Sequence, residues 1–223
     1  EVIRRHPERY RVVALTGHRN VELLAEQARE FSPEVVVLGD ESVDTPKTSG
    51  GTPWPAGREA LLEVAARDDV DVVVNALVGA AGLEPTLATL RAGHRLALAN
   101  KESLVAGGPL VLNAAKEGGG EIVPVDSEHS AILQCLEGYD LDQVQRLVLT
   151  ASGGPFRGKS RSELETVRAE AALKHPTWDM GAKITIDSAT LANKALEVIE
   201  AHFLYGMGYE AIDAVVHPQS IVH

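Results

Sequence analysis

The sequence lacks several features that define whole classes of protein. It has a single cysteine, Cys135, so it cannot form an intrachain disulfide, and we expect a reducing compartment, the cytoplasm. No apolar run approaches the roughly 18 residues of a membrane span, and residues 1–10 are too polar for a secretory signal peptide. Positive charge is also scarce, since the formal net charge is −11, which argues against nucleic-acid or anionic-membrane partners. Small phosphorylated ligands stay compatible with this charge, because they need only a local cluster of donors.

The sequence also lacks a glycine motif, and both ends of the chain read as interrupted. The glycine motif G-x-G-x-x-G of dinucleotide-binding folds does not occur in the 223 residues. The first ten residues read as the tail of a helix, and the last ten, AVVHPQSIVH, stop inside a strand-like run. We therefore expect the chain to be part of a longer polypeptide. We expect Cys135, which lies in the apolar run AILQCLEG, to be a packing residue.

What the sequence does contain is a regular alternation of short apolar segments and helical patterns. The segments are rich in Val and Leu and apolar on both faces, which is typical of a parallel sheet covered by helices. The expected strands are residues 11–15, 34–38, 71–77, 94–100, 121–125 and 145–150, and the expected helices are 20–31, 56–67, 84–92, 104–117 and 128–137. Past residue 150 the pattern changes to a glycine loop, a helix over 160–171 and a long helix over 188–205. The sequence thus predicts an α/β fold, with a Rossmann-like parallel sheet over 1–125 and an α+β domain over 126–223.

Two acidic residues follow the apolar run 121–125. In an extended chain residues i and i+2 point the same way, so Asp126 and Glu128 can aim both carboxylates at one point. Two carboxylates held close together repel each other unless one is protonated or a cation lies between them. Oxygen ligands of this kind suit Mg²⁺ or Mn²⁺. The alternative is a solvated turn after a strand.

Ligands of open parallel sheets bind at the carboxyl ends of the strands. The turn TGHRN (16–20) follows the first expected strand and carries His18 and Arg19 but no acid. Where an acid at this position selects NAD, a base accommodates the 2′-phosphate of NADP. The alternative is a polar turn that begins a helix.

Two other strand ends carry polar groups. Lys101 and Glu102 follow the strand 94–100 and offer a cation and a carboxylate, although such a pair is usually solvated at the surface. Ser152 and the two glycines after it follow the strand 145–150 and can present a hydroxyl and backbone N–H groups to an anion. The alternative for this segment is a tight turn before a helix.

A long helix is expected over residues 187–206, with Asp187 or Ser188 as its N-cap. Glu197 could supply a third carboxylate to a metal, and polar neighbours could hold a phosphate. The alternative is a solvated helix face. The polar stripe consists of Asn193, Glu197 and Glu200, with Lys194 beside it.

The segment HPTWDMG (175–181) precedes this helix and combines Pro, Trp, Met and Gly. Either a mobile lid that excludes water or a loop anchored by a buried Trp178 fits this composition.

Taken in order, these segments resemble the 1-deoxy-D-xylulose 5-phosphate reductoisomerase family of the non-mevalonate isoprenoid pathway. The resemblance covers essentially the whole chain. Its most specific motifs are LALANKESLV (96–105), VPVDSEHSA (123–131), ASGGPF (151–156), HPTWDMGAKITIDSATLANKALE (175–197) and HPQSIVH (217–223).

The resemblance implies a role for each matching residue. The three metal ligands would be Asp126, Glu128 and Glu197, binding Mg²⁺, Mn²⁺ or Co²⁺, and the catalytic set would add Lys101 and His175. The substrate contacts would be Lys101, Ser127, Glu128, Ser152, His175, Trp178, Met180, Ser188, Asn193, Lys194, Glu197, Ser220 and His223. The NADPH contacts would be Gly17, His18, Arg19, Asn20, Asn100, Glu102 and Gly181.

The family's reaction would follow from these roles. A phosphorylated ketose, 1-deoxy-D-xylulose 5-phosphate, would be rearranged and then reduced by NADPH to 2-C-methyl-D-erythritol 4-phosphate. Residues 1–125 would form the NADPH-binding domain and residues 126–223 the catalytic domain, and the protein would be a homodimer. Relative to the family, the glycine-rich phosphate loop and the C-terminal helical domain are not in this chain, and Ala195 stands where many members have Gly.

Two other functions fit the same residues. One is a metal-independent NADP oxidoreductase of Rossmann type, for which the three acidic residues would be dispensable. The other is a non-catalytic module that binds a sugar phosphate.

Overall fold

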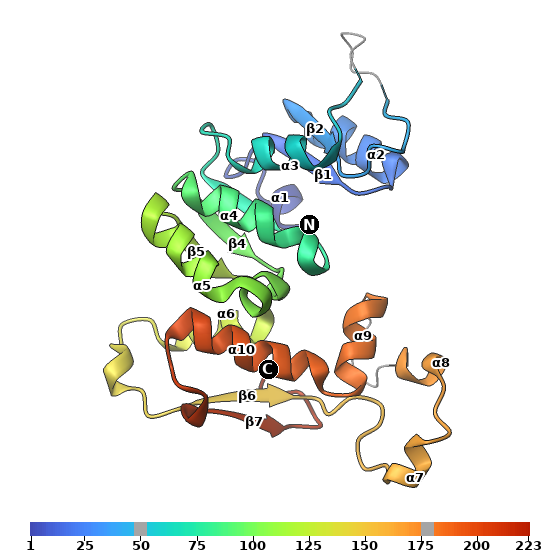
Figure 1. Cartoon of the computed structure of the whole chain (residues 1–223), viewed down its shortest axis with the longest axis vertical. Coiled ribbons are helices and arrows are strands. Elements are labelled where there is room, and N and C mark those ends of the chain that lie inside the picture. Colours follow the sequence, from blue (N-terminus) through green and yellow to red (C-terminus); the bar gives the residue numbers. More distant parts are fainter. Residues whose placement is uncertain (47–52, 175–180) are drawn as a thin grey trace. The chain divides into compact units, whose positions relative to one another are not determined.

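The computed structural model describes residues 1–46, 53–174 and 181–223, and the chain divides into two compact units (Figure 1). Unit 1 comprises Glu1–Asn75, Glu84–Leu96 and Ala114–Glu121. Unit 2 comprises Ala76–Leu83, Ala97–Asn113 and Ile122–His223. The described part of the chain holds no helix that is both long and apolar enough to cross a membrane.

The strands form parallel pairs, as the apolar segments predict. Strand β1 pairs with β2 from Ala14↔Val35 to Gly17↔Leu38, and β6 pairs with β7 from Leu147↔Ile212 to Ala151↔Val216. A three-stranded sheet has the order β3-β4-β5. The strand bounds are β1 Ala14–Gly17, β2 Val35–Leu38, β3 Val72–Asn75, β4 Arg95–Leu98, β5 Glu121–Pro124, β6 Leu147–Ala151 and β7 Ile212–Val216.

The helices follow the strands in the expected alternation. Their bounds are α1 Val2–Arg5, α2 Val21–Phe31, α3 Gly57–Ala65, α4 Leu83–Arg91, α5 Lys101–Gly118, α6 Ser127–Cys135, α7 Arg161–Leu164, α8 Ala169–Ala172, α9 Ala182–Ala189 and α10 Ala192–Tyr205. Single turns of 3-10 helix occur at η1 Gly79–Gly82, η2 Leu141–Gln143 and η3 Tyr209–Ala211. The α/β fold class is thus confirmed, while the division at residues 125 and 126 stays a prediction.

The prediction of one helix over 187–206 was wrong. Leu191 adopts a left-handed conformation (φ 62°), which ends α9 at Ala189 and lets α10 begin at Ala192. Asp187 is therefore not an N-cap but lies inside α9, where its carboxylate accepts a hydrogen bond from Lys183 at 2.7 Å. This i,i+4 pair stabilises the helix at a position whose residue types suggested a helix start.

Three smaller predictions also need correction. The first strand begins three residues later than expected, so Thr16 and Gly17 belong to β1 rather than to the turn. The helix expected over 160–171 is two short ones, α7 and α8. Cys135 is exposed, because α6 packs through Ile132 and Leu136 and leaves the cysteine toward solvent.

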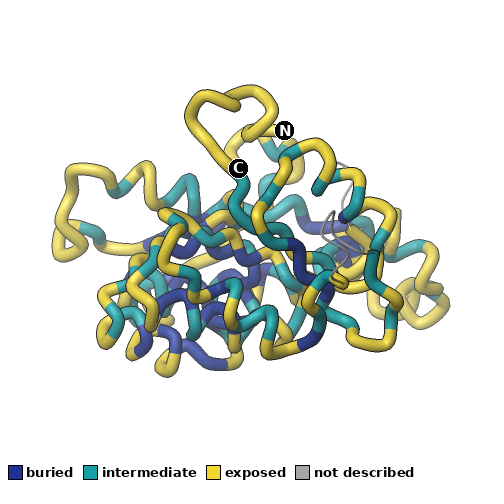
Figure 2. Tube along the Cα trace, turned by 90° about the horizontal axis from the view of Figure 1, so that it is seen from above, coloured by how far each residue is buried: buried dark blue, intermediate teal, exposed yellow. Residues whose placement is uncertain are grey.

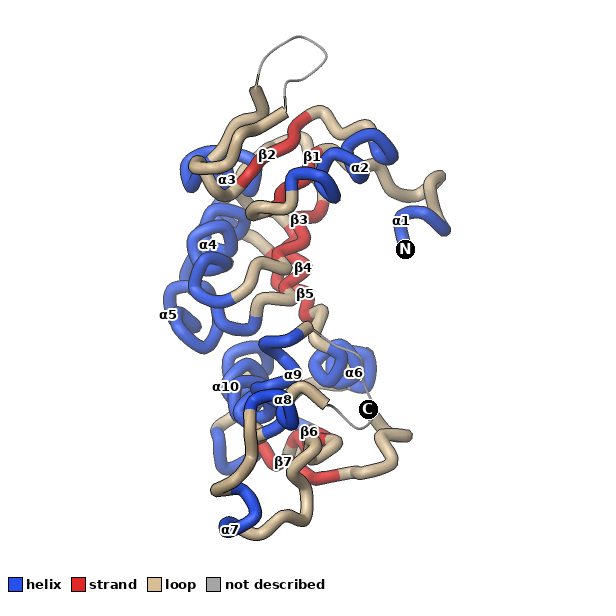
Figure 3. Tube along the Cα trace, turned by 90° about the vertical axis from the view of Figure 1, so that its right-hand side faces the viewer, coloured by secondary structure: helices blue, strands red, loops and turns tan. Residues whose placement is uncertain are grey.

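The core of unit 2 lies between the β6-β7 sheet and the two helices α6 and α10. Figures 1 and 3 show α10 running along one face of this strand pair. Leu149 and Ala201 are buried there, with Tyr205 near the end of α10. Val148 lies on the opposite face of β6 and is 45% exposed, as the alternation of side chains in a strand requires.

Unit 1 has its own small core, in which Leu24 of α2 packs with Val36 and Leu38 of β2. Figure 2 shows the protruding loops of the trace mostly as exposed residues, with the buried residues in the segments between them. Each of the two units therefore buries apolar side chains of its own.

Adjacent residues of β6 test this assignment of faces. Leu149→Ala should lower the free energy of unfolding by about 3 kcal/mol, because it opens a cavity in the core of unit 2. Val148→Ala removes a side chain from the open face and should change it by less than about 1 kcal/mol. Urea unfolding followed by circular dichroism measures both, and equal losses would contradict the faces assigned here.

Candidate functional site

The site begins where β5 ends. Asp126 follows this strand as the N-cap of α6, and its carboxylate accepts a hydrogen bond from the Ser127 N–H at 3.1 Å. Ser127 and Glu128 form the first turn of the helix, so the extended geometry expected for the triplet was wrong. The helix nevertheless brings the two carboxylates together, because an N-cap and the first turn face the same end of the helix.

The third carboxylate belongs to Glu197 of α10, which is distant in the sequence from the other two acids. Carboxylate oxygens of Asp126, Glu128 and Glu197 all lie within 4.8 Å of one another. The structure thus brings Glu197 to the first two acids, while the role of the three as metal ligands stays a prediction. Glu197 is also 1% exposed, which excludes a solvated face for this stripe of α10.

Two buried lysines lie among these carboxylates. The Lys101 ammonium, at the start of α5, pairs with Asp126, donates to Asn193 Oδ1 at 2.9 Å and lies 3.4 Å from Glu197 Oε1. The Lys194 ammonium donates to Glu128 Oε1 at 2.8 Å and to Glu197. Neither lysine is a surface residue, so the solvated pair considered for Lys101 and Glu102 does not describe Lys101.

The close packing of these charges shifts their pKa values. Burial disfavours ionisation of Glu128, but the adjacent Lys194 ammonium outweighs it and lowers the pKa of Glu128 to about 2. Burial and the neighbouring Glu128 carboxylate together raise the pKa of Glu197. Burial lowers the pKa of Lys101, yet Asp126 and Glu197 oppose it more strongly and the pKa lies above its ordinary value.

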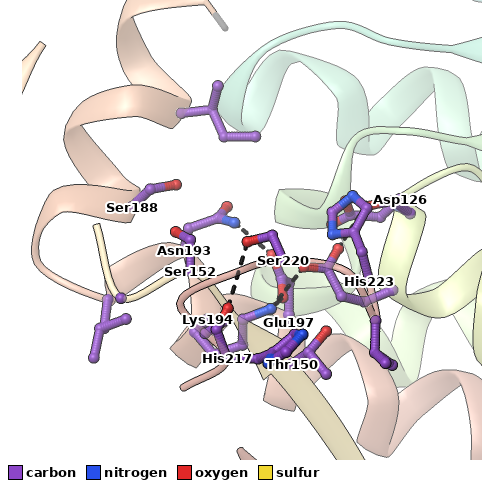
Figure 4. A pocket seen from close by; sticks show the side chains of 17 residues that line it. Asp126, Thr150, Ser152, Ser188, Asn193, Lys194, Glu197, His217, Ser220 and His223 are labelled. Atoms are coloured by element: carbon purple, nitrogen blue, oxygen red, sulfur yellow. Dashed lines mark hydrogen bonds and ion pairs between the residues drawn. The ribbon is translucent and has the colours of Figure 1, made fainter. Parts of the chain in front are cut away.

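A polar cavity opens beside these charges (Figure 4). Its described lining includes the sequence-predicted residues Asp126, Ser127, Glu128, Ser152, Ser188, Asn193, Lys194, Glu197, Ser220 and His223. Residues 175–180, and with them His175, Trp178 and Met180, lie outside the described part of the chain. The cavity therefore combines carboxylates, the Lys194 ammonium and hydroxyls, which suit a cation site next to an anion site.

Glycines shape the wall of this cavity at the end of β6. Gly154 has φ 66°, and a Cβ atom there would lie 2.6 Å from the Ser188 carbonyl oxygen. Only glycine lets the loop approach the end of α9 so closely. Ser152 accepts a hydrogen bond from the Gly154 N–H at 3.2 Å, which keeps its side chain at the cavity.

Two lining residues with polar side chains were missed in the sequence. Thr150 is the last residue but one of β6, and His217 follows β7, where its N–H donates to Ala151 O at 2.7 Å. His217 Nε2 also accepts a hydrogen bond from the Ile221 N–H at 3.1 Å. The signal was present in the motif HPQSIVH, because a histidine directly after a strand lies at the same sheet edge as the other site residues.

A second pocket of unit 2 is lined by Lys101, Glu102, Gly181 and Lys183 together with apolar residues. Lys183 Nζ lies 3.0 Å from Glu102 Oε1 and was not singled out in the sequence. Asn100 is 1% exposed, and its amide donates to the carbonyl oxygens of Leu77 and, at 3.0 Å, Gly79. Asn100 thus fixes the segment that forms one side of this pocket.

The basic turn belongs to unit 1. Gly17 ends β1, and Asn20 caps α2 by accepting a hydrogen bond from the Leu23 N–H at 3.0 Å. Arg19 is largely exposed and pairs with Asp40 at the end of β2. The side chain of Arg19 is thus held at the carboxyl ends of two parallel strands.

Together these features define an α/β protein with parallel strand pairs and a site fit for a divalent cation and an anionic ligand. The sequence profile of 1-deoxy-D-xylulose 5-phosphate reductoisomerase matches residues 1–108, and that of its C-terminal domain matches residues 122–205. The chain belongs to the 1-deoxy-D-xylulose 5-phosphate reductoisomerase family.

Individual relatives agree with this assignment. The enzyme of that name from Synechococcus sp. is 54% identical over 229 residues, which cover 100% of this chain and 58% of the relative. The one from Rhodococcus jostii is 55% identical over 224 residues, covering 100% and 55%. The crystal structure of a DOX-P reductoisomerase in complex with NADPH, fosmidomycin and magnesium is 43% identical, with a TM-score of 0.89 over 100% of this chain and 58% of that one. The chain thus spans a little over half the length of the relatives it matches.

Removing Lys194 tests whether its ammonium group stabilises the fold by compensating the carboxylates of the site. Lys194→Met leaves the buried Glu197 and the half-buried Glu128 without this cation, and should lower the free energy of unfolding by about 3 kcal/mol at pH 7 in the presence of EDTA. The pKa of Glu128 is lowered in the folded state, so the stability that Lys194 provides is present above the ordinary value of 4.5 and lost as pH falls toward about 2. The loss in the variant should therefore be much smaller at pH 3, as measured by urea unfolding.

Lys174→Met, which removes an exposed ammonium, is the matched control and should be nearly neutral at both pH values. An equal loss for Lys194→Met at pH 7 and pH 3 would mean that this lysine stabilises the fold by packing and not by charge.

Proposed function

We propose that this protein catalyses the NADPH- and divalent-metal-dependent rearrangement and reduction of 1-deoxy-D-xylulose 5-phosphate to 2-C-methyl-D-erythritol 4-phosphate. The observation that supports it most is the convergence of Asp126, Glu128 and Glu197 beside a hydroxyl-lined cavity. Family membership and the relative in complex with NADPH, fosmidomycin and magnesium support the same reaction. Residues 1–125 would serve the cofactor and residues 126–223 the metal and substrate.

The residues fit a divalent cation. Three carboxylates within 4.8 Å of one another supply hard oxygen ligands, and their mutual repulsion falls when a cation joins them. Asp126, Glu128 and Glu197 would hold Mg²⁺, Mn²⁺ or Co²⁺. A bound cation would act as a Lewis acid toward the ketose oxygens.

The chain's own residues would bind and orient the substrate. The Lys101 ammonium and the Ser127 hydroxyl adjoin the carboxylates and would contact the hydroxyl and carbonyl end. The cavity residues farther along, Ser152, Ser188, Asn193 and Lys194, would hold the phosphate through hydroxyl, amide and ammonium donors. Ser220 and His223 line the same cavity and would contact the bound substrate. His175, Trp178 and Met180 remain proposed substrate contacts from the sequence motif.

NADPH would use two groups of residues. In unit 1 the turn Gly17–Asn20 would bind the 2′-phosphate through His18 and Arg19. In unit 2 the pocket that contains Glu102 and Gly181, with Asn100 behind it, would hold the reacting end of the cofactor. We also propose a homodimer in the cytoplasm, from the family resemblance and the single cysteine.

The metal role predicts the behaviour of Glu128→Gln, which keeps the shape of the side chain but removes a ligand charge. The assay follows NADPH oxidation with 1-deoxy-D-xylulose 5-phosphate and Mn²⁺, using this chain and a chimera in which the Synechococcus relative supplies the segments that it lacks. Turnover should require Mn²⁺, and Glu128→Gln should abolish it while NADPH binding stays nearly intact.

Glu137→Gln, an exposed acid just beyond α6, controls for the lost charge and should keep full activity. Metal-independent turnover that survives Glu128→Gln would favour the simpler NADP oxidoreductase. Substrate binding without any turnover in the chimera would favour the sugar-phosphate-binding module.

The basic turn predicts cofactor selectivity. Arg19→Ala should weaken NADPH binding about tenfold and leave NADH binding almost unchanged, because only NADPH carries the 2′-phosphate that the guanidinium would bind. Fluorescence titration of both cofactors against the chimera measures the two affinities. An equal loss for both cofactors would remove Arg19 from the phosphate site.

A further inference from the structure

Helices α6 and α10 share a second buried group of titratable side chains behind the cavity. His129 of α6 and Glu200 of α10 are both 0% exposed, and His129 Nε2 lies 3.0 Å from Glu200 Oε2. Neither is among the described residues that line the cavity. These two side chains therefore have no direct access to a ligand there.

The pair lies close to Asp126 in space and near the other two acids along the helices that carry them. His129 directly follows Glu128, and Glu200 lies three residues after Glu197 on the same face of α10. Nitrogen and oxygen atoms of Asp126, His129 and Glu200 lie within 4.8 Å of one another. The His129–Glu200 contact thus joins the two helices at the level of the three acids.

A second contact joins the same helices. The Tyr205 hydroxyl of α10 donates a hydrogen bond to the main-chain carbonyl of His129 at 2.6 Å. The rings of His129 and Tyr205 are 6.2 Å apart and tilted by 48°. Besides the Lys194–Glu128 ion pair, the first turn of α6 is therefore held to α10 by the His129–Glu200 pair and by this hydrogen bond.

Stability alone explains this pair poorly. Removing a carboxylate and an imidazole from water is costly, and apolar residues of similar volume often serve a core as well or better. What a buried charged pair adds is an attraction between two particular side chains, which favours one spacing of the elements that carry them. Here those elements carry Asp126 and Glu128 on one side and Glu197 on the other.

We infer that His129 and Glu200 are positioning residues, which hold α6 and α10 at the spacing where Asp126, Glu128 and Glu197 converge on a divalent cation. The inference rests on the proposed cation site. Neither residue touches the cation, and both act through the carboxylates beside them. Outer partners of metal ligands typically account for 10- to 100-fold in metal affinity.

The test measures Mn²⁺ affinity by electron paramagnetic resonance, on the whole chain without substrate, together with urea unfolding. Glu200→Gln keeps the size of the side chain without its charge, and His129→Phe keeps an aromatic ring without its nitrogen atoms. Each variant should weaken Mn²⁺ binding about tenfold. The double variant should be no weaker than the poorer single variant, because the two residues act as one unit. His129→Gln should recover most of the affinity, since its amide nitrogen can donate to Glu200 from a similar place. Glu137→Gln, with the same loss of charge at an exposed site, should bind as the wild type does.

The outcomes separate the two proposals. A wild-type chain that binds no Mn²⁺ overturns the cation site and the positioning role together. If the wild type binds Mn²⁺ and folded Glu200→Gln and His129→Phe bind within twofold of it, the pair is only structural and the positioning role alone is wrong. If either variant does not fold, Tyr205→Phe is the deciding variant, because it removes only the hydroxyl that bonds the same two helices. A loss of Mn²⁺ affinity of about threefold supports the inference, and an unchanged Mn²⁺ affinity overturns it.

Discussion

The compensation of buried charge between two lysines and three carboxylates is the interaction on which the rest of unit 2 depends. Lys101 and Lys194 place their ammonium groups among Asp126, Glu128 and Glu197, in a region almost closed to water. Removing one charge would leave another buried without a partner, which costs several kcal/mol. These contacts hold the beginning of α5, the first turn of α6 and the first turns of α10 to one another.

The surrounding fold serves to deliver these groups to one place. Strand β5 ends at Pro124, one residue before Asp126 is reached. The break at Leu191 separates Ser188 from the turn that carries Asn193 and Lys194. The glycine at 154 then allows the end of β6 to pack directly against the Ser188 carbonyl. The ligands for a cation and the hydrogen-bond donors for an anion thus come from four elements that are distant in the sequence. This is usual at the carboxyl ends of parallel strands.

Family membership and local geometry support the proposed reaction independently. The profile matches and the relatives near 55% identity concern the sequence, whereas the convergence of the acids is a property of the tertiary structure. The donor set alone would fit many enzymes that bind phosphorylated compounds with a divalent cation. Within that class, the family points to the proposed reaction. The buried His129–Glu200 pair would keep α6 and α10 at the spacing at which the acids converge.

The sequence by itself determined the alternation of strands and helices and the residues at the strand ends, because both follow from local hydrophobic patterns and from motifs in the chain. It suggested Asp126, Glu128 and Glu197 as one metal site but left a solvated helix face open for Glu197, since no local rule relates positions some seventy residues apart; the family motifs strengthened the suggestion. Tertiary structure decided that they meet, that Lys101 and Lys194 are buried among them, and that Asp187 lies within a helix that ends at Ala189. It also decided that His129 faces Glu200, because burial and pairing depend on which helix faces pack together and not on the residues next to each in the chain.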